Sequence, residues 1–135
     1  MDNEAIKWFD IAGWGVEGKG WAETKAPFDR LPARAEGVVP DAVWNLSHSG
    51  IGMCSHFNTN STRIYARWKL AEDQLGEDNF NVCGYSGVDL YAFDGKTKRW
   101  RWAGAPAHAS ITDKTPSTVL AEGLNARKRK YCLYL

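Results

Sequence analysis

Alternation of hydrophobic and polar residues dominates the second half of the chain and predicts β-strands rather than helices. Between residues 62 and 70, Ile64, Ala66 and Trp68 fall on one side, while charged residues occupy much of the other. This period of two is typical of a strand with one buried face. Similar β-prone runs cover residues 43–47, 51–57, 88–93, 98–102 and 131–135.

Turn-forming residues separate two of these runs and predict a hairpin. Residues 94–97, with the sequence Asp-Gly-Lys-Thr, join the run 88–93 to the run 98–102. In the second run of this hairpin, alternation places Trp100 and Trp102 on one face and the intervening arginine on the other.

The remaining segments show no strong strand pattern. Residues 1–40 combine closely spaced glycines with three prolines, which predicts irregular extended pieces. Residues 71–79 are acidic and polar and predict a loop. Residues 117–124 are interpreted as a short helix that starts at Ser117, against the preference of the β-branched pair Thr118 and Val119.

Many short strands and few helices favour an all-β fold, specifically a jelly-roll-like antiparallel β-sandwich. A chain of 135 residues fits a single domain, here 1–135, and contains no apolar run long enough to span a bilayer. The final β-prone run reaches the last residue without a turn. The domain is therefore expected to be truncated at its C-terminal end.

Composition narrows the partners that can be expected. A net charge of +1 gives no overall field for nucleic acid or an anionic membrane, so neither is predicted as a partner. Two local basic runs, 96–101 and 127–130, are interpreted as solvated faces. The seven tryptophans are unusual and leave three uses open: a core, a sugar-stacking face, or an interface with another domain.

The residue types of an enzyme site are present, but not in a catalytic pattern. Three cysteines without a CxxC pair are interpreted as reduced thiols, with one internal disulfide left open. No histidine has a second ligand at zinc spacing, so no metal and no cofactor is predicted. The sequence around Ser86 departs from the nucleophile elbow because it precedes a strand and has Val88 at the last position. No catalytic residue is predicted in this chain.

A short motif in the chain resembles that of a known protein family. Gly87-Val88-Asp89-Leu90-Tyr91 resembles the Gly-x-Asp-Leu-Tyr motif of a domain that lies upstream of SGNH-type (GDSL-like) esterase domains in bacteria. Three further segments fit the same family in the same order: 27–32 (PFDRLP), 43–47 with 49–51 (VWNLS and SGI) and 98–102 (KRWRW). The resemblance covers roughly residues 8–135.

The resemblance implies a jelly-roll-like sandwich at the N-terminus of a larger hydrolase that acts on esters, in several relatives acetyl esters of polysaccharides. The implied function is a non-catalytic accessory module that packs on an SGNH hydrolase domain in the same polypeptide. The esterase triad has no matching positions here, so this segment alone is not expected to be an enzyme. The alternative is an independent carbohydrate-binding module that uses a Trp/Tyr stacking face, with a polysaccharide as its partner.

Within the motif, strand alternation turns Val88 and Leu90 to one side and Asp89 and Tyr91 to the other. Gly87 would permit a bulge or a close backbone approach. The motif residues expected to matter are Gly87, Asp89, Leu90 and Tyr91. The side chains expected to contact a ligand or a partner domain are Asn45, His48, Trp100 and Trp102.

The cellular compartment stays open. The first four residues, Met-Asp-Asn-Glu, lack the apolar region of a signal peptide. The resemblance implies a bacterial protein. Without a visible signal peptide the default expectation is the cytoplasm, and a secreted or periplasmic location is expected if a signal has been removed. The substrate and the oligomeric state are likewise not determined by the sequence.

Overall fold

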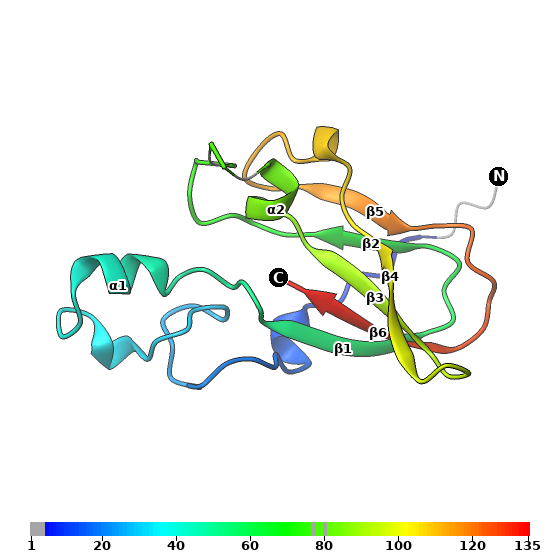
Figure 1. Ribbon diagram of the computed structural model, residues 1–135, viewed down its shortest axis with the longest axis horizontal. Helices are drawn as coiled ribbons and strands as arrows, with labels where there is room; N and C mark the ends of the chain where they lie inside the picture. The colour runs from blue at the N-terminus through cyan, green and yellow to red at the C-terminus, as the bar shows by residue number, and fades with distance from the viewer. Residues whose placement is uncertain (1–4, 77, 80) are drawn as a thin grey trace. The chain divides into compact units, whose positions relative to one another are not determined.

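The computed structural model describes residues 5–76, 78–79 and 81–135, and the chain forms two compact units, Met1–Ser55 and His56–Leu135 (Figure 1). They are called unit 1 and unit 2 below, and each is described by itself. The expectation of a single domain stays a prediction.

Unit 1 contains short helical segments joined by irregular chain. They are the 3-10 helices η1 (Ile11–Gly13) and η2 (Ala33–Ala35) and the helix α1 (Asp41–Leu46). The carboxylate of Asp10 caps η1 by accepting a hydrogen bond from the backbone N–H of Ala12 at 3.0 Å. The irregular structure predicted for residues 1–40 is confirmed for the described residues.

The strand predicted for residues 43–47 is wrong, because residues 43–46 lie in α1 and Ser47 is the C-cap of that helix. The helix starts after Pro40, whose carbonyl accepts hydrogen bonds from Val43 and Trp44. Asp41 in the first turn places a negative charge at the positive end of the helix dipole. The β-branched Val43 favours a strand, but Pro40 and Asp41, which are typical of the start of a helix, favour α1.

Unit 2 is built on two sheets (Figure 1). The larger sheet has the strand order β1 (Cys54–Thr59), β6 (Arg129–Tyr134), β3 (Asp89–Asp94) and β4 (Arg99–Gly104). The smaller sheet pairs β2 (Ile64–Arg67) with β5 (Ser117–Ala121). A short helix α2 (Val82–Ser86) precedes β3, and the 3-10 helix η3 (His108–Ser110) follows β4.

The two sheets of unit 2 pack against each other through one apolar cluster. Ile64 and Leu120 from the smaller sheet join Leu90 and Tyr131 from the larger one. Phe57 of β1 stacks on Tyr131 with ring centroids 5.4 Å apart. The recorded pairs β2–β5, β3–β4 and β3–β6 are antiparallel. The all-β antiparallel prediction is therefore confirmed, while the jelly-roll topology stays a prediction.

The hairpin predicted around residues 94–97 is confirmed. Its strands are in register at Phe93 and Trp100 and at Asp94 and Arg99. The carboxylate of Asp94 closes the turn by accepting hydrogen bonds from the Thr97 hydroxyl at 2.8 Å and the Lys96 backbone N–H at 2.9 Å.

Two segments of unit 2 differ from the prediction. The helix predicted for residues 117–124 is wrong: Thr118 and Val119 pair with β2 as part of β5, as β-branched residues prefer. The helix α2 was not predicted; the side chain of Asn81 caps it by accepting a hydrogen bond from Gly84 at 2.8 Å. Among the described residues, no helix is both long and apolar enough to cross a membrane.

Candidate functional site

Gly87 ends α2 and leads directly into β3. Its backbone N–H donates to the carbonyl of Cys83 at 3.0 Å. A Cβ at this position would stand 2.2 Å from that carbonyl oxygen, far inside normal contact. Its φ of −92° is open to any residue. Glycine is therefore needed here for space, and the predicted close backbone approach is confirmed.

The rest of the motif alternates across β3 as predicted. Val88 and Leu90 are buried in the core cluster, and Leu90 has no exposed surface. Asp89 is exposed, and Tyr91 lies across from Trp102 on the side of the sheet opposite the core. The motif thus anchors β3 on one side and presents two polar side chains on the other.

Neighbouring strands add further aromatic side chains to this side of the larger sheet. The register sets Trp100 opposite Phe93, Trp102 opposite Tyr91, and Tyr134 opposite Asp89. Trp102 is 62% exposed, Tyr134 42% and Trp100 38%. We call the five side chains Tyr91, Phe93, Trp100, Trp102 and Tyr134 the outer aromatic face.

Contacts within the outer aromatic face hold its side chains in place. The indole N–H of Trp102 donates to the carboxylate of Asp89 at 3.0 Å. Tyr91 meets Tyr134 edge-on at 5.6 Å, a favourable geometry for two aromatic rings. The partner of Asp89 among the described residues is therefore a side chain of the adjacent strand.

The Trp100 end of the outer aromatic face is the more crowded one. Phe93 meets Trp100 edge-on at 5.3 Å, and the ring of His56 lies 5.4 Å away. The ammonium group of Lys130 lies 5.6 Å from the Trp100 ring centroid, within cation–π range. A ligand at this end would meet positive charge as well as an indole.

Cysteine and histidine residues lie on the adjacent strands β1 and β6. The ligand atoms of His56 and Cys132 are within 4.8 Å of one another. Cys54 stands two residues before His56 in the same strand, and none of the three cysteines forms a disulfide. Thiolates and imidazole are the ligand types that soft metal ions select. The expectation of no metal therefore stays a prediction.

In unit 1, His48 is oriented by a buried carboxylate. Asp29 is 4% exposed and accepts hydrogen bonds from His48 Nδ1 at 2.9 Å and from the Ala26 backbone N–H at 2.9 Å. The ring of Trp44 meets the imidazole edge-on at 5.1 Å. With Nδ1–H donating to Asp29, Nε2 is left as a hydrogen-bond acceptor; it has no partner among the described residues and can accept a hydrogen bond from a ligand or a partner.

Two of the segments that carried the family resemblance form one hydrogen-bonded substructure in unit 1. Besides the pair of Asp29 and His48, the Arg30 backbone N–H donates to the Ser47 carbonyl at 2.8 Å. The Arg30 Nε donates to the Ser49 carbonyl at 3.1 Å. Segments 27–32 and 43–51 therefore occur together because each satisfies the polar groups of the other.

Ser86 is a structural residue in this fold. It is 5% exposed, and its hydroxyl donates to the carbonyl of Leu75 at 2.8 Å. Its own carbonyl accepts the indole N–H of Trp68 at 2.8 Å. A nucleophilic serine needs a base within reach and access to substrate. Ser86 is inaccessible to substrate, in agreement with the sequence.

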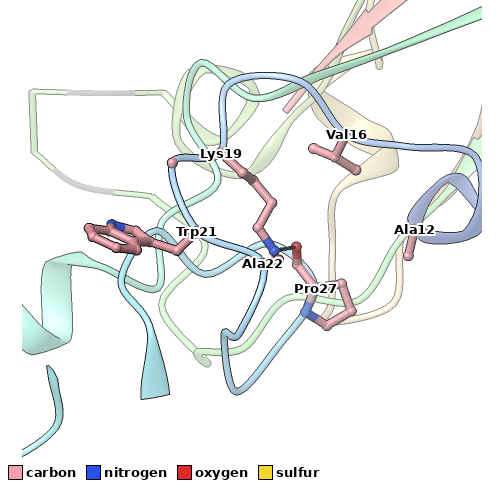
Figure 2. Close-up of a pocket in the computed structure, with 7 residues that line it drawn as sticks. Ala12, Val16, Lys19, Trp21, Ala22 and Pro27 are labelled. Carbon is pink, nitrogen blue, oxygen red and sulfur yellow. Dashed lines mark hydrogen bonds between the residues drawn. The ribbon is translucent and has the colours of Figure 1, made fainter. Parts of the chain in front are cut away.

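A hollow in unit 1 is lined by Ala12, Val16, Lys19, Gly20, Trp21, Ala22 and Pro27 (Figure 2). Lys19 points across it, and its ammonium group donates to the Pro27 carbonyl at 2.6 Å and the Thr24 hydroxyl at 2.9 Å. Trp21 is 44% exposed, with the Arg34 guanidinium 4.9 Å from its ring centroid. The ammonium group of Lys19 is already hydrogen-bonded within its own loop. The hollow is therefore a concave surface without an available reactive side chain among its described lining residues.

Among the predicted contact residues, the structure groups Trp100 and Trp102 with the motif on the outer aromatic face. Asn45 and His48 both belong to unit 1, where Asn45 is exposed on α1. Sequence reasoning missed Tyr134, whose place in the terminal strand and period-two spacing could have identified it. It also missed the role of Asp29: this residue lies in the segment 27–32 that carried the family resemblance, but no local pattern indicates its pairing with His48, 19 positions away.

Comparison with known proteins identifies the family. The model of a family described as GxDLY, the N-terminus of SGNH-hydrolase-type esterases, matches residues 6–135. A crystal structure of a candidate GDSL-like lipase from Bacteroides ovatus ATCC 8483 aligns with 92% of this chain at a TM-score of 0.77 and 26% identity. This chain spans 35% of that protein. The comparison with curated proteins found no match.

Proposed function

Because the chain belongs to the GxDLY family, the N-terminus of SGNH-hydrolase-type esterases, we propose that it is a non-catalytic accessory module. In this proposal it packs on an SGNH hydrolase domain in the same polypeptide. The observation that carries the proposal is the outer aromatic face, which is exposed, preorganised and built around the residues of the family motif.

The outer aromatic face has the character of a protein interface. Interface centres are enriched in Trp and Tyr, and single aromatic anchors often contribute about 2 kcal/mol or more to binding. Trp102 is the most exposed member, and its hydrogen bond to Asp89 fixes the indole before a partner arrives. Less side-chain entropy is then lost on binding.

Unit 1 by itself offers polar side chains for contact with a partner. His48 presents Nε2 in an orientation fixed by Asp29, and Asn45 offers an exposed amide on α1. We assign both to contacts with the partner domain or its substrate. Ester hydrolysis, on carbohydrate or acetyl esters, belongs in this proposal to the partner domain, as the name of the Bacteroides ovatus relative suggests for a longer protein.

The test uses this chain and the SGNH hydrolase domain encoded by the same gene, expressed as separate polypeptides. Isothermal titration calorimetry would compare the wild type with Trp102→Ala, and with Trp21→Ala as the matched control on unit 1. Loss of one hot-spot indole should weaken binding by about 30-fold, and the control should stay within about twofold of wild type. Absence of a hydrolase domain from the gene, or equal affinity in both variants, contradicts the proposal.

A second candidate function is carbohydrate binding on the same face. It is favoured by one observation: Trp102 exposes most of a flat indole and is held by a hydrogen bond at its edge, as a sugar-stacking platform requires. Affinity electrophoresis in gels containing xylan or xyloglucan tests this function. Retardation that disappears in Trp102→Ala supports it, and unretarded migration of the wild type in every gel excludes it.

A further inference from the structure

Two basic segments that are distant in the sequence lie at one end of the larger sheet. Register between β3 and β4 places the turn after Asp94, and register between Ala92 and Tyr131 places the start of β6 at the same end (Figure 1). The six exposed cations there are called the basic end: Lys96, Lys98, Arg99, Arg127, Lys128 and Lys130.

The cations of the basic end have no carboxylate partner in the part of the chain that the structure describes. None of the six forms an ion pair with a described residue. Residues 94–101 and 125–130 together hold eight of the 17 lysines and arginines of the chain and only one of its 16 carboxylates. That carboxylate, Asp94, is already bound by Arg101 at 3.0 Å. A chain of net charge +1 therefore concentrates its positive charge at one place.

Local backbone contacts keep the second basic segment in position. The guanidinium of Arg129 donates to the Asn125 carbonyl at 3.1 Å and to the Arg127 carbonyl at 3.3 Å. Arg129 thus ties the segment before β6 together, and its neighbours Lys128 and Lys130 stay exposed. Clustered like charges repel one another and weaken the fold unless a partner supplies the opposite charge.

We propose that the basic end binds an acidic polysaccharide, whose carboxylate groups recur along the chain and meet the clustered cations. The exposed part of the Trp100 ring would pack on one sugar ring beside them. This inference does not depend on docking to a hydrolase domain, because its six cations lie outside the outer aromatic face, with which the basic end shares Trp100 alone.

The arrangement favours a glycan over a nucleic acid. Single-stranded nucleic acids bind where several exposed aromatic rings in series stack successive bases along a basic groove. Trp100 is the one exposed aromatic ring that the structure describes at the basic end, so a series of rings for successive bases is not found among the described residues there. The next indole, Trp102, donates a hydrogen bond to the Asp89 carboxylate, and the negative charge of this carboxylate repels phosphate.

The experiment is affinity electrophoresis of the 135-residue chain in gels containing polygalacturonate, with neutral dextran gels as reference. The test variant Lys96→Glu/Lys128→Glu changes one residue in each basic segment. The matched control Lys7→Glu/Lys69→Glu changes the same net charge at two exposed lysines outside the basic end. Circular dichroism of all three proteins confirms that they are folded.

Wild type should be retarded by polygalacturonate and not by dextran, with retardation that weakens between about 50 and 200 mM salt. The test variant should lose about tenfold or more in affinity, whereas the control should keep most of it. The proposal is overturned if wild type migrates freely, or if the control loses as much as the test variant. It is also overturned if single-stranded DNA of the same total charge binds at least as tightly.

Discussion

The substitution Gly87→Ala tests the physical reason for the first residue of the family motif. The added Cβ would lie 2.2 Å from the Cys83 carbonyl oxygen and 3.0 Å from its carbonyl carbon, both backbone atoms that cannot rotate away. To reach ordinary contact, the backbone at the end of α2 or the start of β3 must shift by roughly 1 Å, and overpacking of this kind costs about 1–3 kcal/mol.

Two smaller effects modify that cost. The hydrogen bond from the Gly87 N–H to the Cys83 carbonyl would be strained, and a typical hydrogen bond contributes about 1 kcal/mol. In the opposite direction, alanine reduces the entropy of the unfolded chain, which stabilises by about 0.4–1 kcal/mol. The net expectation is a loss of about 1–3 kcal/mol in the free energy of unfolding of unit 2.

Urea denaturation, monitored by tryptophan fluorescence, measures this loss. The indole N–H of Trp68 donates a hydrogen bond to the Ser86 carbonyl at the end of α2, so its emission reports on this region. Gly95→Ala is the matched control, since a Cβ there meets no atom within 4 Å. Its midpoint should shift little. If Gly87→Ala and Gly95→Ala have the same midpoint, close backbone approach is not the reason for glycine in the motif.

The core, the hairpin turn and the histidine pair give further predictions. Leu90→Ala should lower the free energy of unfolding by about 2–5 kcal/mol, because Leu90 is fully buried, and chemical denaturation measures the change. The pKa of Asp94 is held far below its ordinary value, chiefly by the hydrogen bond from the Thr97 hydroxyl. The ionised carboxylate therefore stabilises the turn fully at a pH above the ordinary pKa of an aspartate. Asp94→Asn should therefore lower the melting temperature at pH 7, and thermal scans should show this difference shrinking as pH falls below about 4. Asp29→Asn should disturb the tautomer of His48, seen as changed ring ¹⁵N shifts in NMR spectra; unchanged shifts would contradict the assigned hydrogen bond.

Period-two patterning predicted the strands of unit 2 well, because burial of one face acts on every second residue. The alternation of Ile64, Ala66 and Trp68 is preserved in the core cluster. The hairpin followed from turn chemistry at residues 94–97, which is local and readable. The antiparallel character of the fold could thus be derived from short segments.

Features that depend on pairing between distant segments could not be derived in this way. Residues 117–124 alone predict a helix in place of β5, because the pairing of this strand with β2 is not visible in the local sequence. The helix α1 shows the reverse error, since its start at Pro40 and Asp41 outweighed the strand preference of Val43.

The candidate site was predicted in part. Alternation correctly separated Leu90 from Asp89 and Tyr91, and Trp100 from its charged neighbours. The bond between Asp89 and Trp102 depends on the register of β3 and β4, including a shift between Leu90 and Tyr91 that no sequence rule supplies. The basic end likewise exists only because β3 and β6 are paired.

The central claim, that the outer aromatic face is a docking surface for a hydrolase domain, is tested most directly by the solvent exposure of one indole. Incorporation of 5-fluorotryptophan gives a ¹⁹F NMR signal for Trp102, assigned with Trp102→Phe, whose shift between H₂O and D₂O reports contact with water. In the isolated chain, where Trp102 is 62% exposed, this isotope shift should be large. In the polypeptide that also contains the hydrolase domain it should nearly vanish, whereas an isotope shift that stays the same in both would contradict the account.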